Sequence, residues 1–392
     1  MRWSTTRSVA LALALLGAAR AQEPASPQEG AMQFGLAVWR AAGAQKPDEN
    51  ACLGPLSISC ALGMTALGAG GETRAEMHRV LGLADTPQAH AALAGLLRPP
   101  SQEGVLVLPA NRLFLARRFQ PLAAFLQAAS SAYEADAVQV DFTPDPEVGR
   151  KVINDWVAER TQQKIPTLLN PSDVNRGTPL VLVNALYVKA SWATRFDPAR
   201  TSPAAFHLLS GPAVQVPTMR LEAQLPCAEA EDGLRLCELP YQGGRLAALI
   251  LLPPAGELRA LEARLEPAAL KRWVGALRQQ KAELALPRFE VRKHAELQDL
   301  LQELGMKRAF QPSADFSGMS ADPLMIAKVI HEAFLRVDEE GSEAAAATAV
   351  VMAPGGPPPG AFRMTVDRPF LLLIRDRTTG AVLFVARVTD PR

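Results

Sequence analysis

The chain has 392 residues, and its 41 Lys and Arg residues nearly balance its 40 Asp and Glu residues, which gives a formal net charge of +1. Because the two signs are interspersed, the sequence offers no extended basic surface for nucleic acid or an anionic membrane, so we expect neither as a partner. Four cysteines are too few to crosslink a protein of this length into a disulfide scaffold.

Residues 1–21 are predicted to form a signal peptide. Arg2 and Arg7 precede the apolar stretch 9–17, and Ala19-Arg20-Ala21 supplies the small residues of a cleavage site. The apolar stretch is shorter than the ~20 residues needed to cross a bilayer. We therefore expect a secreted chain, extracellular or periplasmic. Residues 22–392 contain no linker or repeat, only short Pro and Gly clusters typical of loops, which predicts a single domain.

Two helices are predicted in the first half of the chain. The first begins near Pro55 and ends at the glycines of "GAGG", and the second covers residues 146–165. Each has an apolar stripe at helical spacing. The stripe residues are Leu56, Cys60, Met64 and Leu67 in the first helix and Val152, Ile153, Trp156 and Val157 in the second.

Two strands carry polar residues among apolar ones. Residues 179–189 are apolar on both alternating faces, which indicates a central strand, and Asn184 lies within it. A buried amide must find hydrogen-bond partners, so we expect them for Asn184. Residues 329–340 place His331 on an apolar face, which favours a hydrogen-bonded core histidine over a catalytic or metal role.

Further strands are predicted at 213–219, 234–239, 246–252, 283–291 and 381–388. Helices and strands do not alternate regularly, so the pattern favours an α+β fold over a doubly wound one.

Cys227 and Cys237 flank a short segment that contains Glu231-Asp232-Gly233. If this segment is the tip of a hairpin, the two cysteines lie opposite each other and can form a disulfide after export. Cys60 is predicted to be a buried thiol, and the state of Cys52 is left open.

No motif for catalysis or cofactor binding stands out. The five histidines, at 78, 90, 207, 294 and 331, show no HExxH pattern and no clustering with cysteine, so no metal site is predicted. The sequence contains no GxSxG and no GxxxxGK[ST] motif. A Ser/His/Asp site assembled from distant positions has no support in the sequence. We therefore predict no catalytic residues and no cofactor.

The segment "EEGSEAAAATAVVMAPGGPPPG", residues 339–360, combines conflicting local preferences. Its alanine run favours helix, the Thr/Val patch favours strand, and the Gly/Pro end favours turns or extended chain. Such a segment is either a flexible linker or a switch between two conformations.

The sequence resembles the serpins over nearly everything after the signal peptide. The matching stretches are "NACLGPLSISCALGMTALGAGGETRAEMHRVLGL", "INDWVAERTQQKIPTLL", "LVLVNALYVKASWATRF", "LCELPY", "LPRFEV", "LGMKRAF…ADFSGM", "KVIHEAFLRVDEEGSEAAAAT" and "DRPFLLLIRDRTTGAVLFVARVTDP". The resemblance is to an exported inhibitory serpin of the prokaryotic type. It implies three β-sheets, eight or nine helices and an exposed reactive-centre loop at about 339–362.

The resemblance also implies a mechanism. In inhibitory serpins a target protease cleaves the loop and forms an acyl-enzyme, and the loop then enters the main sheet as an extra strand and distorts the protease. The chain would therefore be a protease inhibitor and not an enzyme. We expect it to be a monomer that forms a covalent complex with its protease. No basic helix is present to recruit a polyanion cofactor.

The first half of the loop suits insertion because its side chains are small. Gly341 can supply hinge dihedrals, and Glu343 alternates to the face opposite Ser342, where it can stay solvated. The predicted hinge comprises Glu339, Glu340, Gly341, Ser342, Glu343, Ala344, Ala345, Ala346, Ala347 and Thr348.

Other positions gain roles from the resemblance. Ser57, Asn184 and His331 match the polar cluster that controls opening of the main sheet. Trp192 matches the tryptophan where insertion begins, and Arg288 is expected to pair with Glu339. Gly54 departs from the serine usual in the family at that position.

Counting seventeen residues from Glu339, the usual inhibitory loop length, places the reactive bond between Gly355 and Gly356. The alternative is Met352–Ala353, which offers a side chain for a protease pocket but shortens the inserted arm. The lack of Arg or Lys between Arg336 and Arg363 argues against a trypsin-like target. A small or apolar preference, elastase-like or subtilisin-like, is expected. The alternative function is a non-inhibitory serpin-fold protein, either a protease substrate or a binding or chaperone-like module.

Overall fold

The computed structural model describes residues 26–98, 104–230, 232–342 and 360–392. The predicted signal peptide, the hinge residues from Glu343 to Thr348 and both candidate reactive bonds lie outside the described residues.

The main sheet runs in the order β10-β11-β4-β2-β3, with β12 pairing on β4. β4 is buried along nearly its whole length, as the doubly apolar pattern predicts, and His331 in β11 is fully buried. The six strands are β10 (Phe289–Glu296), β11 (Lys328–Val337), β4 (Leu180–Ser191), β2 (Val105–Ala116), β3 (Ala137–Val140) and β12 (Gly341–Ser342).

A second sheet has nine strands. Eight of them run in the order β1-β15-β14-β8-β7-β6-β9-β13, and the ninth, β5, pairs with β6. The 16-residue β6 pairs with β5 and β9, and its last three residues pair with β7. Two of the three predicted sheets are thus joined through β6. The strands are β1 (Ala51–Leu53), β15 (Val382–Val388), β14 (Phe370–Asp376), β8 (Leu246–Leu252), β7 (Arg235–Pro240), β6 (Val214–Glu229), β9 (Arg278–Pro287), β13 (Phe362–Thr365) and β5 (Ser202–Phe206).

Nine α-helices occur in the described ranges, in agreement with the predicted eight or nine. They are α1 (Pro27–Gln45), α2 (Pro55–Ala66), α3 (Gly71–Leu81), α4 (Pro87–Leu96), α5 (Ala123–Tyr133), α6 (Pro146–Arg160), α7 (Leu258–Arg264), α8 (Pro267–Ala276) and α9 (Gln298–Glu303). Short 3-10 turns occupy Pro171–Asp173, Pro198–Arg200 and Arg308–Phe310. Among the described residues, no helix is long and apolar enough to cross a membrane. The predicted α+β class is confirmed.

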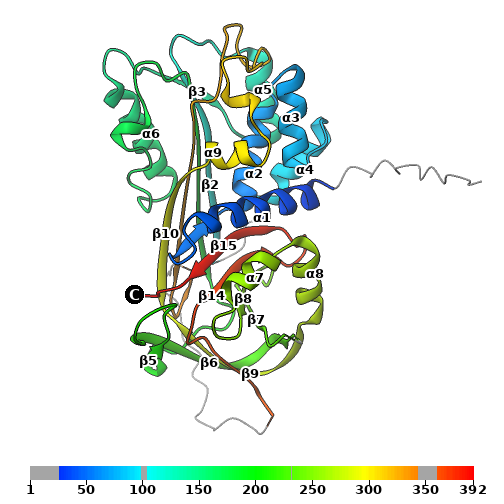
Figure 1. Cartoon of the computed structure of the whole chain (residues 1–392), viewed down its shortest axis with the longest axis vertical. Coiled ribbons are helices and arrows are strands. Elements are labelled where there is room, and N and C mark those ends of the chain that lie inside the picture. Colours follow the sequence, from blue (N-terminus) through cyan, green and yellow to red (C-terminus); the bar gives the residue numbers. More distant parts are fainter. Residues whose placement is uncertain (1–25, 99–103, 231, 343–359) are drawn as a thin grey trace, which may run out of the picture.

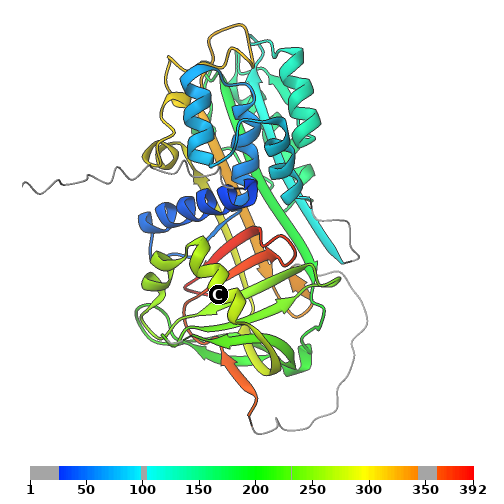
Figure 2. The same cartoon turned by 90° about the vertical axis from the view of Figure 1, so that its right-hand side faces the viewer.

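The helices cover both faces of the main sheet. α2 to α5 lie on one side of its strands and α6 on the other (Figure 1). The dark blue α1 crosses the molecule between the helical end and the β-rich end (Figure 2). All twelve residues of α2 are buried, so this helix forms the inner support of the main sheet and not a surface layer.

Several boundaries differ from the sequence prediction. The helix predicted over 146–165 ends at Arg160, and Val152 is 47% exposed, so it is not part of the inner stripe that Ile153 and Val157 form. The single strand predicted at 283–291 is two strands, β9 and β10, which break at Arg288, where the backbone N–H donates to the Pro217 carbonyl instead. Strand β2 was not predicted, because Pro109 and Asn111 interrupt its apolar pattern.

Candidate functional site

The central feature of the main sheet is a parallel pair, β4 beside β11. Seven residue pairs join them, from Lys328↔Val181 to Phe334↔Tyr187. Their other neighbours, β2 and β10, are antiparallel to them. A strand entering between β4 and β11 in the direction of β12 would replace one parallel ladder by two antiparallel ones. Antiparallel pairing is somewhat more stable per residue.

The start of the hinge pairs with β4 just beyond the end of this parallel ladder. After β11 the chain reverses, and β12 pairs antiparallel with β4, with Gly341 opposite Ser191 and Ser342 opposite Ala190. A Cβ on Gly341 would lie 2.0 Å from the Ala190 carbonyl oxygen, so only glycine allows this approach. Glycine is therefore required here for space, and a role of Gly341 in supplying hinge dihedrals during insertion stays a prediction.

Two stacked aromatic rings hold the start of the hinge. The rings of Trp192 and Tyr241 lie 4.6 Å apart at 7°. The Trp192 indole N–H donates to the Asp338 carbonyl at 2.9 Å, and its backbone N–H donates to the Glu340 carbonyl at 2.9 Å. Tyr241 Oη is 2.6 Å from Ser342 Oγ, and burial raises the pKa of this phenol. Trp192 therefore lies at the point where β12 joins the sheet, and its role at the start of insertion stays a prediction.

The base of the loop is fixed by an ion pair. Arg288 Nε donates to Glu339 Oε1 at 2.6 Å, and Thr201 Oγ1 donates to the same oxygen at 2.5 Å. The expected Arg288–Glu339 pair is thus present in the structure. Burial acts to raise the pKa of Glu339, but the hydrogen bonds from Arg288 and Thr201 outweigh it and hold this pKa below its usual value.

A row of polar side chains crosses the middle of the main sheet. His331, Asn184 and Asn111 are register partners on β11, β4 and β2. The Asn184 amide donates to Ser57 Oγ on α2 at 2.7 Å and also to Asn111 Oδ1, and its own Oδ1 contacts His331 Nδ1. The structure brings together Ser57, Asn184 and His331 as predicted. Since the His331–Asn184 bond bridges the β4–β11 pair, inserting a strand there must break it.

The protonation of His331 follows from its partners. The Gly54 backbone N–H donates to His331 Nε2 at 3.1 Å, so Nε2 accepts and Nδ1 carries the proton that is donated to Asn184. Burial lowers the pKa of His331 to about 3. The ring is therefore neutral at neutral pH, and the row contains no buried charge.

Gly54 keeps the contact to the histidine although it departs from the family's usual serine, since its backbone N–H is the donor to His331 Nε2. A Cβ at this position would lie 2.9 Å from Leu186 Cδ2, so the end of that side chain would have to shift slightly to make room for one.

Three residues of the site were missed by the sequence analysis: Asn111, Tyr241 and Thr201. Asn111 had the same signal as Asn184, an amide inside an apolar strand, but the strand itself was not recognised. Thr201 has no sequence signal, because its role arises from a contact with a residue 138 positions away.

The two cysteines of the predicted hairpin are register partners on β6 and β7, and both are fully buried. Their sulfurs lie 3.1 Å apart and both are free thiols in this structure. The placement agrees with the hairpin argument, and the disulfide stays a prediction. Cys52 and Cys60 are buried thiols.

Comparison with known proteins decides the family. Residues 29–391 match the family described as serpin (serine protease inhibitor). The chain belongs to the serpin family. Its sequence is 38% identical over 370 residues to serine proteinase inhibitor 2.4 of Apodemus sylvaticus, with 91% of this chain and 87% of the relative covered. It is 36% identical to an uncharacterized serpin-like protein of Thermococcus kodakarensis, with 88% and 82% covered.

Solved serpins have the same fold. Human thyroxine-binding globulin superposes with a TM-score of 0.84 at 30% identity, with 93% of this chain and 98% of the globulin covered. Serpin48 of Tenebrio molitor gives 0.83 at 31% identity, with 94% and 98% covered. The similar proteins thus include one named as an inhibitor and one named for binding thyroxine.

The buried neutral His331 predicts a specific pH dependence of stability. Its ordinary pKa is about 6.5 in the unfolded chain, while the folded value is about 3. Between these values the unfolded state binds the proton and the folded state does not, so stability falls as pH falls. Relative to His331→Gln, the wild type should lose up to about 1.4 kcal/mol of unfolding free energy per pH unit in this window.

Denaturant unfolding between about pH 7 and pH 4 measures this difference. His207→Gln, at an exposed position after β5, is the matched control and should follow the wild type. Parallel pH profiles for the wild type and His331→Gln would contradict the assignment.

Proposed function

We propose that this protein is a secreted suicide inhibitor of a serine protease, or of a cysteine protease, and not an enzyme. The observation that carries the proposal is β12, which already pairs with β4 at the open end of the β4–β11 pair. The hinge is therefore poised to continue along this line once the loop is cut.

The register of β12 assigns a place to each hinge residue in the inserted form. Continuing from Gly341↔Ser191 and Ser342↔Ala190 would set Glu343 opposite Lys189 and Thr348 opposite Asn184. Directly opposed residues share a face of the sheet. Glu343 would thus meet a half-buried cation, and the Thr348 hydroxyl would meet the polar row left open by the broken His331–Asn184 bond.

The same register places small side chains where space is least. Ala344 and Ala346 would lie opposite Val188 and Leu186, on the face that α2 covers. Alanine loses almost no side-chain entropy on burial and needs little room. Insertion breaks one ladder and forms two, and each net hydrogen bond adds about 0.5–1.5 kcal/mol. These gains provide the driving force after cleavage.

Trapping requires that insertion of the loop be faster than hydrolysis of the acyl bond. The protease nucleophile attacks the Gly355 carbonyl and forms an acyl bond while the amine of Gly356 leaves, and water would next hydrolyse that bond. Insertion from Ser342 to Gly355 moves the acylated end roughly 43 Å along the sheet, at ~3.3 Å per residue. Cleavage at Met352–Ala353 would shorten this arm by roughly 10 Å. Gly355–Gly356 is therefore the preferred bond.

The target is proposed to have a small or apolar pocket, as in elastase-like or subtilisin-like proteases. Glycine before the bond fills no larger pocket, and no basic residue is available for a trypsin-like one. The partner is this protease, bound covalently to a monomeric serpin. Export is proposed from residues 1–21, and no polyanion cofactor is proposed.

A non-inhibitory function is the second candidate. Its support is the stretch Gly355-Gly356-Pro357-Pro358-Pro359-Gly360, which offers a protease little side chain and few backbone donors. A similar structure, thyroxine-binding globulin, was solved in complex with thyroxine. In this case the loop would be a plain protease substrate, or the fold would serve as a binding or chaperone-like module.

Incubation of the mature protein with an elastase-like, a chymotrypsin-like and a subtilisin-like protease tests the proposal. We expect a complex with at least one of them that survives denaturing electrophoresis, and release of residues 356–392 in the intact mass. The same proteases with their nucleophile replaced are the control and should give no such band. Clean cleavage that leaves every protease fully active would overturn inhibition and favour the second candidate.

Ala346→Arg tests the insertion register. The guanidinium would have to enter the face covered by α2, which should slow insertion. Hydrolysis of the acyl bond would then be faster than insertion, and the variant would be cleaved as a substrate. The ratio of molecules cleaved as substrate to molecules that trap the protease, measured by titration, should rise at least about 10-fold, which is the effect of slowing insertion by ~1.4 kcal/mol.

Pro359→Arg is the matched control for this variant. It adds the same side chain to the same loop, but beyond the reactive bond, where no residue enters the sheet. It should trap as the wild type does. Unchanged trapping by Ala346→Arg would contradict the register.

A further inference from the structure

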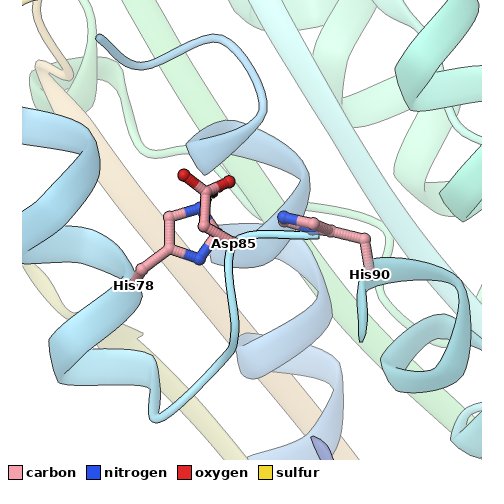
Figure 3. A group of neighbouring side chains, drawn as sticks. All are labelled: His78, Asp85 and His90. Atoms are coloured by element: carbon pink, nitrogen blue, oxygen red, sulfur yellow. Dashed lines mark ion pairs between the residues drawn. The ribbon is translucent and has the colours of Figure 1, made fainter. Parts of the chain in front are cut away.

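Three potential metal ligands meet away from the main sheet. His78 lies in the last turn of α3, Asp85 in the connection that follows, and His90 in the first half of α4 (Figure 3). One ligand atom from each lies within 4.8 Å of the others. His78 Nε2 is 3.4 Å from Asp85 Oδ1. The cluster therefore has the dimensions of a site for a single ion.

Both histidines have an unsatisfied nitrogen pointing into this cluster. The residues are only 7% and 1% exposed, and the Nε2 atom of each is buried without a hydrogen-bond partner among the described residues. A buried polar atom without a partner costs about 1–3 kcal/mol and is rare in folded proteins. The two atoms lie close together, so one ligand that binds both nitrogens would satisfy them.

The other ring nitrogens are held as in known metal sites. His78 Nδ1 lies 3.0 Å from the Leu83 carbonyl oxygen, which can only accept, so Nδ1 carries the proton and Nε2 has the free lone pair. His90 Nδ1 lies 2.6 Å from Tyr133 Oη, which can accept its proton, and in that tautomer Nε2 has a free lone pair for a metal. Metal-binding histidines typically use their second nitrogen for such an orienting hydrogen bond.

The carboxylate of Asp85 is already paired with one cation, the guanidinium of Arg74. Arg74 Nε donates to Asp85 Oδ2 at 2.7 Å, and its guanidinium also contacts Oδ1. Each carboxylate oxygen has a second lone pair, so an ion can share the carboxylate with Arg74.

We propose that His78, Asp85 and His90 form a binding site for a divalent transition-metal ion of the zinc class. Two imidazole nitrogens and one carboxylate oxygen are three of the four ligands that Zn²⁺ prefers. The side chain of Asp85 is 45% exposed, so water can reach the fourth position. The ion would join α3 to α4 next to α2, the helix that carries Ser57.

This proposal revises the prediction of no metal site. The two histidines are separated by eleven residues that span a helix end, a loop and a helix start, so no short motif marks them. The sequence feature that could have indicated the site is Asp85, which lies between the two histidines in a connection too short for α3 and α4 to separate.

Titration of the tag-free, chelator-treated full-length protein with ZnCl₂ in a calorimeter tests the site. We expect saturable binding of one ion per chain and a rise in the thermal unfolding midpoint when Zn²⁺ is added. Co²⁺ bound in its place should give the strong visible absorption of a four-coordinate site. An absence of saturable binding by the wild type would overturn the proposal.

Two variants localise the ion. His90→Gln and Asp85→Asn should each weaken binding at least about 10-fold, and Asp85→Asn changes an exposed residue, so the fold is expected to survive it. His207→Gln, at an exposed position, should bind as the wild type does. Wild-type affinity in Asp85→Asn and His90→Gln, or equal loss in His207→Gln, would place the ion elsewhere and contradict the site.

Discussion

The parallel pairing of β4 with β11 lies in the middle of the main sheet, between antiparallel neighbours on both sides. The chain that leaves β11 turns back at Asp338 and pairs antiparallel with the end of β4. We propose that a better-paired sheet becomes available to the same sequence once the loop is cut, because a strand entering between β4 and β11 would exchange one parallel ladder for two antiparallel ladders.

Three contacts surround this pair. Trp192 and Tyr241 lie beside β12, the Arg288–Glu339 pair fixes the loop base, and the His331–Asn184 bond bridges the middle. We propose that the His331–Asn184 bond controls opening, because a neutral hydrogen bond can be exchanged for one with an incoming strand without burying a charge.

The sequence predicted the fold class, the central strand and the grouping of Ser57, Asn184 and His331, because apolar patterns and the family resemblance mark all of these. It did not predict β2, whose Pro109 and Asn111 break the strand pattern, although Asn111 completes the polar row. A second reason for Gly341 was missed, since the close approach of the Ala190 carbonyl depends on a strand pairing that local sequence does not encode. The contacts of Thr201 and the cluster at His78 were missed for the same cause: both depend on tertiary neighbours.

If the cut loop becomes a strand between β4 and β11, the protein should be much more stable after cleavage than before it. The thermal unfolding midpoint measured before and after a single cut between residues 352 and 356, with the position of the cut confirmed by mass, tests this directly. We expect a large rise in the midpoint, with slower amide exchange along β4 and β11. An unchanged midpoint and unchanged exchange would mean that the strand does not insert.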